Sequence, residues 1–83
     1  MLIDRAREAG NFEEVVNYAE TFLLTDPDDE AIHEALMRGY AHQGNRSAAV
    51  KHYQQYAEQL RTELNTQPSR RLRSLLDEIA RDG

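Results

Sequence analysis

Three histidines are the first candidates for chemistry in this chain: His33, His42 and His52. Two histidines that bind one metal from a single helix usually stand four residues apart, whereas these are separated by nine and ten residues. We therefore predict His33 at a contact between helices, His42 near a turn and His52 on an outer helix face. No metal and no cofactor is expected.

Other catalytic combinations are missing from the sequence. The chain has no Cys, which excludes disulfides, thiolate metal sites and thiol catalysis. No Ser or Thr lies in a nucleophile elbow, and no Gly-rich phosphate loop occurs. The acidic run Asp26–Glu30 lacks the alternating ligands and distal Glu of a calcium-binding EF-hand. We therefore expect that the chain is not an enzyme.

Glu34, Arg38 and His42 follow one another at intervals of four residues, on the face of a predicted helix opposite Leu36 and Tyr40. One interpretation is a simple surface pair between Glu34 and Arg38, which stabilises a helix by a few tenths of a kcal/mol. The other is a row of side chains that contacts a partner.

Arg70, Arg71 and Arg73 form a basic cluster where the last predicted helix begins. Positive charges at that end of a helix oppose its dipole. The compensating charge could come from Asp77 and Glu78, from acidic residues of the N-terminal half, or from an external partner. The three arginines are therefore also candidates for partner binding.

The net charge of −5 is unevenly distributed along the 83 residues. Residues 1–34 carry a net charge of −8, and residues 35–83 carry +3. An acidic small domain is a poor nucleic-acid binder, so we expect no direct nucleic-acid binding. The asymmetry could steer two copies or a charged partner together, or it could reflect only different solvated faces. No apolar run approaches the ~18 residues that a membrane span needs, so no membrane contact is expected.

Helical periodicity dominates the chain and predicts an all-α fold. Residues 12–24 have an apolar stripe on one face. Asp26 as N-cap and Pro27 at the first helical position predict a second helix that reaches about His42. Gly44 should end it with a left-handed backbone. The expected inward residues of these two helices are Phe12, Val15, Val16, Ala19, Phe22, Leu23, Ile32, Ala35, Leu36 and Tyr40.

Two more helices follow. The first should run from about Arg46 to Leu64 and end at Asn65, which tolerates a left-handed backbone, before Pro68 forbids continuation. Ser69 should cap the next helix. The expected inward residues are Ala49, Val50, Tyr53, Tyr56, Ala57, Leu60 and Leu64 in the first helix, and Leu72, Leu75, Leu76, Ile79 and Ala80 in the second.

The chain also contains an internal repeat. A shift of 34 residues places Gly10-Asn11 on Gly44-Asn45 and aligns the apolar positions of the helices that follow. A period of 34 with two helices per unit is that of a tetratricopeptide repeat. We therefore predict about five helices in tetratricopeptide-like antiparallel hairpins. The expected divisions are a partial first repeat (1–26), a second repeat (27–64) and a C-terminal capping helix (65–83).

The stretch from about Thr25 to Ile79 resembles the bacterial transcriptional activator domain. That all-helical domain follows a winged-helix DNA-binding domain in activators of the antibiotic-regulatory type. The most specific part of the resemblance is the ending, in which Glu63-Leu64 is followed by Pro68-Ser69 and a leucine helix. The residues that carry the resemblance are Asp26, Pro27, His33, Leu36, Met37, Arg38, Gly44, Arg46, Ala48, Ala49, Tyr53, Glu63, Leu64, Pro68, Ser69, Leu72 and Leu75.

The resemblance implies a non-enzymatic, cytoplasmic domain that makes protein contacts within a transcriptional regulator, with the transcription machinery or with a second copy of itself. It implies that Glu34, Arg38 and His42 face a ligand peptide. It also implies that the chain is either a domain cut from a regulator or a stand-alone relative. Two alternatives remain open: a tetratricopeptide-like adaptor unrelated to transcription, and a self-associating structural module such as a homodimer.

Overall fold

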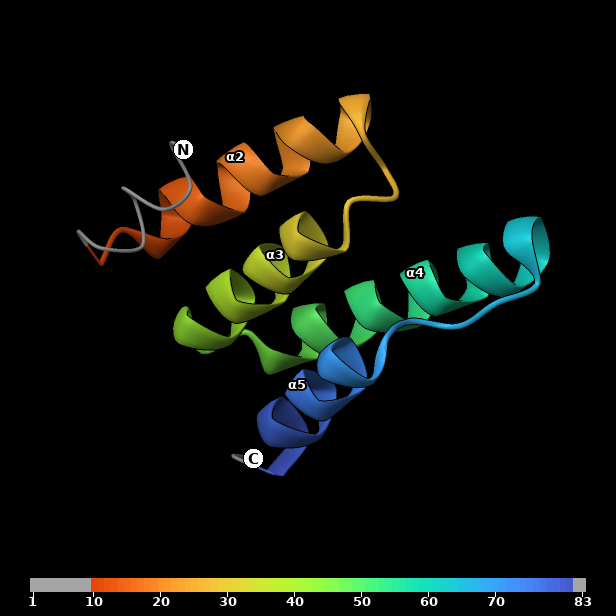
Figure 1. The fold of residues 1–83 in the computed structure, drawn as a ribbon. Helices are drawn as coiled ribbons and strands as arrows, with labels where there is room; N and C mark the ends of the chain where they lie inside the picture. Colours follow the sequence, from red (N-terminus) through yellow and green to blue (C-terminus); the bar gives the residue numbers. More distant parts are fainter. Residues whose placement is uncertain (1–9, 82–83) are drawn as a thin grey trace.

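The computed structural model describes residues 10–81, and in this part of the chain the only regular secondary structure is helical, with no strand. Successive helices run roughly antiparallel to one another, and the last one lies beside the second and third described helices, at the end of the group away from the first (Figure 1). The all-α prediction is therefore confirmed. The helices are α2 (Phe12–Thr25), α3 (Glu30–His42), α4 (Arg46–Leu64) and α5 (Arg70–Arg81).

The two Gly-Asn pairs adopt the same geometry at the starts of α2 and α4. Gly10 and Gly44 have φ of +75° and +77°, a left-handed backbone that a side chain would strain. Asn11 then caps α2 and Asn45 caps α4, and each side-chain oxygen accepts a hydrogen bond from the amide three residues later, at 3.2 and 3.3 Å. The 34-residue repeat thus corresponds to a repeated turn.

The start of α3 differs from the prediction. The helix begins at Glu30 with Asp29 as its N-cap, whose carboxylate accepts from the Ala31 amide at 3.1 Å. Asp26 instead ends α2, where its amide donates to the Phe22 carbonyl. Residues 26–29 form a turn instead, in which the Asp29 amide donates to the Asp26 carbonyl, and the Pro27 carbonyl accepts a hydrogen bond from the His33 ring.

The connection from α4 to α5 matches the prediction. Asn65 ends α4 in a left-handed conformation with φ of +51°. Pro68 is buried, and the Ser69 hydroxyl accepts from the Leu72 amide at 3.2 Å, which makes Ser69 the N-cap of α5. Leu72 and Leu75 face inward, whereas the three arginines of the basic cluster are exposed.

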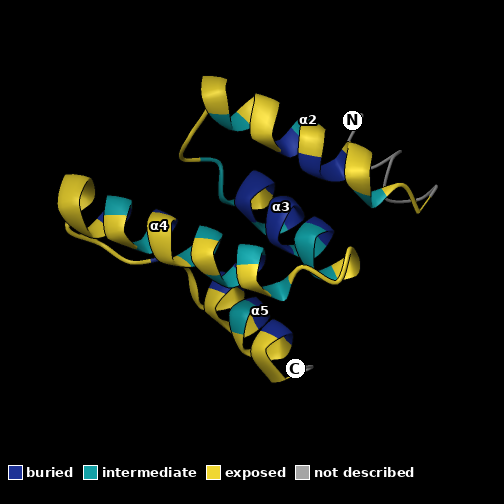
Figure 2. Cartoon of the chain, turned by 180° about the vertical axis from the view of Figure 1, so that it is seen from behind, coloured by how far each residue is buried: buried dark blue, intermediate teal, exposed yellow. Residues whose placement is uncertain are grey.

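The buried residues lie on the sides of the helices that face one another (Figure 2). The backbones of α2 and α3 approach closely at Gly39, where an added Cβ would lie 2.8 Å from Val16 Cγ2. The buried residues form two clusters, and α3 contributes to both. One joins α2 to α3 through Val15, Val16, Ala19, Ile32, Ala35 and Leu36; the other joins α3, α4 and α5 through Met37, Ala49, Tyr56, Leu60, Leu72, Leu75 and Ile79.

Several predicted inward residues lie at the margin of these clusters. Phe22 is 37 % exposed and Leu64 is 59 % exposed, because each lies near the end of its helix, beyond the packed neighbours. Ala80 is also exposed. The short first helix expected in residues 1–8 lies outside the described residues. Within residues 10–81, no helix combines the length and apolar character needed to cross a bilayer.

Candidate functional site

The candidate site is formed where α5 begins, beside the middle of α4. Arg70 and Arg73 are one helical turn apart and therefore share a face of α5. Together with Tyr53 of α4 they border a hollow of about 440 Å³, which we call the arginine pocket. Its lining consists of Tyr53, Arg70, Arg73, Ser74, Leu76 and Asp77.

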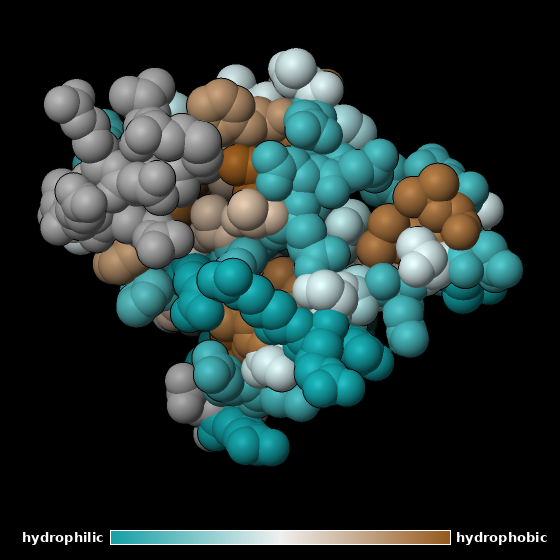
Figure 3. All heavy atoms as spheres, viewed as in Figure 1, coloured by the Kyte–Doolittle hydropathy of each residue, from teal (hydrophilic) through white to brown (hydrophobic). Residues whose placement is uncertain are grey.

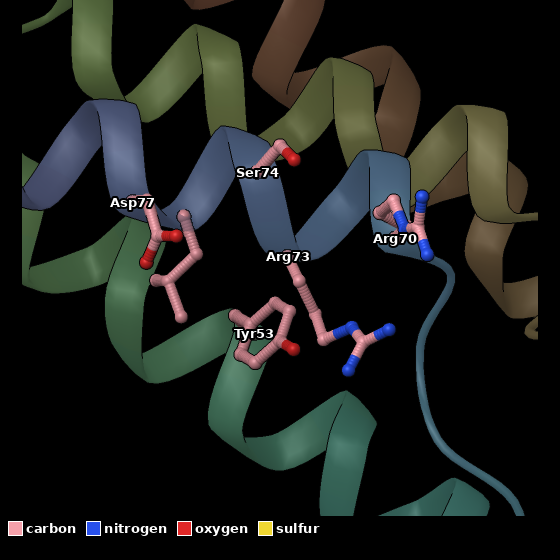
Figure 4. Close-up of a pocket in the computed structure, with 6 residues that line it drawn as sticks. Tyr53, Arg70, Arg73, Ser74 and Asp77 are labelled. Atoms are coloured by element: carbon pink, nitrogen blue, oxygen red, sulfur yellow. The ribbon is translucent and has the colours of Figure 1, made fainter.

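The charged groups of the arginine pocket are separated rather than paired. Figure 4 shows the guanidinium groups of Arg70 and Arg73 at one end, with Arg73 extending past the Tyr53 ring, and Asp77 at the other end. Neither arginine makes an ion pair within residues 10–81. Pairing with Asp77 and Glu78, one of the sources of compensating charge considered above, is therefore not found among the described residues.

Arg71 has a different environment from its two neighbours. Its Nε lies 3.2 Å from Glu34 Oε2, so it is held against α3. Glu34 also pairs with Arg38, whose Nη2 lies 3.2 Å from Glu34 Oε1, and the Glu34 side chain is only 13 % exposed. One of the three arginines is thus compensated by an acid of the N-terminal half, one of the sources considered above.

The electrostatics of the arginine pocket favour an anion. Burial raises the pKa of the Tyr53 hydroxyl; nearby Arg73 opposes that shift, and Asp77 adds to it. The Tyr53 phenol is therefore a neutral hydrogen-bond donor at neutral pH. The two guanidinium groups and the Tyr53 phenol can together bind a carboxylate or phosphate with charge-assisted hydrogen bonds.

The predicted row Glu34, Arg38 and His42 does not form one open surface. Glu34 is enclosed between α3 and α5 by its two arginines. Arg38 and His42 border a smaller hollow of about 170 Å³ against α5. His42 also stacks on the Phe12 ring of α2, with centroids 4.1 Å apart. The pairing of Glu34 with Arg38, one of the two interpretations of this row, is present, and partner contact by these residues stays a prediction.

A second polar cluster, which the sequence reasoning missed, connects α3 to α4. His33 is 4 % exposed, as predicted for a contact between helices. Its Nδ1 lies 2.8 Å from His52 Nε2, and its Nε2 lies 2.7 Å from the Pro27 carbonyl oxygen. The prediction that His52 lies on an outer face is wrong, because its ring packs against α3.

The protons of this histidine pair can be assigned from chemistry. A carbonyl oxygen only accepts, so His33 Nε2 carries a proton and donates it to Pro27. When His33 is neutral, its Nδ1 accepts from His52 Nε2. Burial, together with the smaller effect of neighbouring His33, lowers the pKa of His52 to about 4. Burial also lowers the pKa of His33, against the Pro27 hydrogen bond and nearby acids.

The same cluster continues to the cap of α5. Tyr56 stacks on His33 with centroids 3.7 Å apart, and its hydroxyl donates to Glu30 Oε2 at 3.5 Å. Glu30 also accepts from the Ser69 amide at 3.4 Å and from the Ser69 hydroxyl. We call these residues the polar joint: the Pro27 carbonyl, Glu30, His33, His52, Tyr56 and Ser69. No signal at short spacing identifies it, since its members come from four segments of the chain.

Hydrophilic side chains cover most of the face over α5, and hydrophobic ones gather over the C-terminal half of α4 (Figure 3). The most exposed large apolar side chains in the described part are Leu24, at 86 %, and Leu64, at 59 %. The described residues bring together no group of three or more metal-ligating side chains. The face around α5 therefore contains a charged pocket, and the large exposed apolar side chains of the described part lie elsewhere, on α2 and α4.

Comparison with known proteins gives one result that covers nearly the whole chain. The family model described as the bacterial transcriptional activator domain matches residues 1–80. This range includes the N-terminal part, which in the sequence resembled only half of a repeat. Neither the curated proteins nor the solved structures give a significant match. The chain belongs to the bacterial transcriptional activator domain family.

Proposed function

We propose that this chain is a non-enzymatic interaction domain of a bacterial transcriptional regulator. Membership of the family assigns it to transcriptional regulation. The observation that carries the interaction role is the arginine pocket, in which Arg70 and Arg73 have no ion-pair partner within residues 10–81. Charges that the described residues do not neutralise are available to another molecule.

The helix arrangement supports the same proposal. The repeated Gly-Asn turns and the close approach of α2 and α3 at Gly39 are features of tetratricopeptide-like hairpins, which present surfaces to proteins. In this proposal α5 is the capping helix of the stack and also presents its outer face for binding. The partner is another domain of the regulator or a component of the transcription machinery.

Self-association is the second candidate, and charge favours it. Glu13, Glu14 and Glu20 are exposed on α2, which has no basic residue, whereas α5 carries four arginines. Two copies could therefore meet with α2 of one against α5 of the other. Sedimentation at increasing protein concentration tests this candidate, since a monomer at every concentration contradicts it.

The main proposal is tested by bacterial two-hybrid assays with the chain as bait. The prey are the other domains encoded with it, the subunits of RNA polymerase and the chain itself. We expect one of these pairs to give a signal and Leu72→Asp, which places a charge at a fully buried position, to abolish it. The absence of a signal from every pair, with the bait folded and expressed, contradicts the proposal. A winged-helix segment encoded upstream of Met1 would support the regulatory assignment independently.

A further inference from the structure

We propose that the arginine pocket binds carboxylates of an acidic segment of a partner protein. This inference rests on the proposed function and names the chemistry of the partner. The segment places a Glu or Asp side chain between the guanidinium groups of Arg70 and Arg73, and the hydroxyl of Tyr53, which lies beside Arg73, donates a further hydrogen bond to it.

The first step is the contrast between arginines in one helical turn. Arg71 is neutralised by the mostly enclosed Glu34, which is already shared with Arg38. Arg70 and Arg73 project from the other side of α5, into the arginine pocket. The positive end of the α5 dipole adds to their charge rather than offsetting it. An anion that binds here gains from both guanidinium groups without breaking an ion pair between described residues.

The second step identifies the anion as a protein carboxylate. A planar carboxylate matches the fork of donors on a guanidinium group. The hollow of about 440 Å³ has room for a side chain and part of a backbone, and Leu76 supplies an apolar contact next to the charges. The ligand therefore has an acidic group with carbon atoms attached to it, as in a peptide.

The third step concerns nucleic acid, which also carries anions. A phosphate backbone needs several cations along its length, whereas this pocket offers two, with Asp77 at its other end. The chain has a net charge of −5, which repels a polyanion at long range. A short acidic segment can place one carboxylate at the arginine end and leave its neighbours in solvent, away from Asp77.

The experiment measures fluorescence anisotropy of a labelled peptide with the sequence Gly-Glu-Glu-Leu-Glu-Gly, titrated with the purified chain at low salt. A peptide with glutamine in place of each glutamate is the matched control, and a labelled 20-base-pair DNA duplex is the third probe. We expect the chain to bind the glutamate peptide and to bind the other two at least tenfold more weakly.

Variants locate the binding. The double variant Arg70→Gln, Arg73→Gln should weaken binding of the glutamate peptide about tenfold or more, because it removes both charged donors. The control Lys51→Gln, Arg61→Gln removes the same charge from exposed positions on α4 and should change the affinity less than twofold. Asp77→Asn should tighten binding a few-fold, because it removes the repulsive carboxylate. Circular dichroism verifies that each variant is folded.

Three results would overturn the inference: no binding of the glutamate peptide, equal weakening by both double variants, or tighter binding of the DNA. Its failure is distinguishable from failure of the proposed function. If a two-hybrid pair keeps its signal with Arg70→Gln, Arg73→Gln, the chain is an interaction domain that uses another surface. If the peptide binds as expected but no pair gives a signal, the pocket is real and the assigned partners are wrong.

Discussion

The polar joint and the arginine pocket both lie near the start of α5, and they differ in whether their charged and polar groups have partners. In the polar joint, Glu30 accepts hydrogen bonds from Tyr56 and Ser69, and His33 bonds through both ring nitrogens. In the arginine pocket, Arg70 and Arg73 have no ion pair within the described residues.

The difference distinguishes groups that hold the fold from groups that are available to a ligand. Polar atoms inside a small domain must be hydrogen-bonded or they destabilise it, and the described residues leave no buried side-chain polar atom without a partner. Exposed charged groups are hydrated by water and need no partner within the protein. Two arginines that oppose a helix dipole are locally unfavourable, and this type of compromise is found where a protein binds something.

Removing the central ring of the polar joint should have the largest effect on stability. His33→Ala leaves a space beneath Tyr56 and takes away the partner of both His52 and the Pro27 carbonyl. We expect the free energy of unfolding to fall by about 2–4 kcal/mol, as for other large-to-small changes at buried positions. Urea denaturation followed by circular dichroism measures it.

The matched change in the arginine pocket is Arg73→Ala, which truncates a long side chain at an exposed position. It should alter the free energy of unfolding by less than about 0.5 kcal/mol. Equal losses for the two variants would contradict the distinction between the polar joint and the arginine pocket.

Glu30→Gln should give the next largest effect. The variant keeps the size of the side chain but removes the charge that accepts from Tyr56 and Ser69. It also weakens the favourable interaction of a carboxylate with the N-terminus of α3. We expect a loss of about 1–2 kcal/mol in the free energy of unfolding. Asp28→Asn removes the same charge two residues earlier, at an exposed position, and should cost less than half as much.

The histidine pair should make stability depend on pH. His52 has a pKa of about 4 in the folded chain, whereas an unfolded histidine titrates near 6.5. Between these values the unfolded state binds more protons, so stability falls as pH decreases from about 6.5 toward 4. We expect His52 to account for a loss of about 1 kcal/mol, since the ring keeps partial access to water.

The contribution of His52 is isolated by comparing variants in chemical denaturation at pH 7.0 and pH 4.5. His52→Gln should reduce the difference in unfolding free energy between the two pH values. His42→Gln, which changes a histidine outside the polar joint, should leave that difference as it is. A pH dependence that is the same in His52→Gln as in the parent chain would show that the acidic residues alone produce it.

Most of the described helices could be predicted because their signals are local. Gly44, Asn45 and Asn65 determine where α3 ends, α4 begins and α4 ends, and each acts within a few residues of itself. The start of α3 was the exception. Asp26, Asp28 and Asp29 can all cap a helix, and the local sequence alone does not choose between them; in the fold Asp29 is the cap, and the loop before it contacts the His33 ring.

The candidate site was predicted less completely, since its geometry is tertiary. The arginine cluster could be recognised from its position at a helix start. The separate environments of Arg71 and Arg73 could not, because they depend on Glu34 from another helix and on Tyr53 from a third. The contact between His33 and His52 was missed for the same reason: 19 residues separate them along the chain, and only the packing of α3 on α4 brings them together.

The smallest expected effects compare arginines within the first turn of α5. Arg70→Gln should raise the free energy of unfolding by about 0.3–0.5 kcal/mol, because it removes a positive charge from the positive end of the helix dipole. Arg71→Gln also removes a positive charge from that end of the helix, but it loses the ion pair with the mostly enclosed Glu34. We therefore expect a net loss of about 0.5 kcal/mol in the free energy of unfolding. Thermal unfolding at low and at high salt measures both. Salt should diminish the gain in Arg70→Gln, since screening weakens exposed charges first. If Arg70→Gln also lowered stability, Arg70 would be as much a part of the fold as Arg71, and the arginine pocket would lose its distinction from the polar joint.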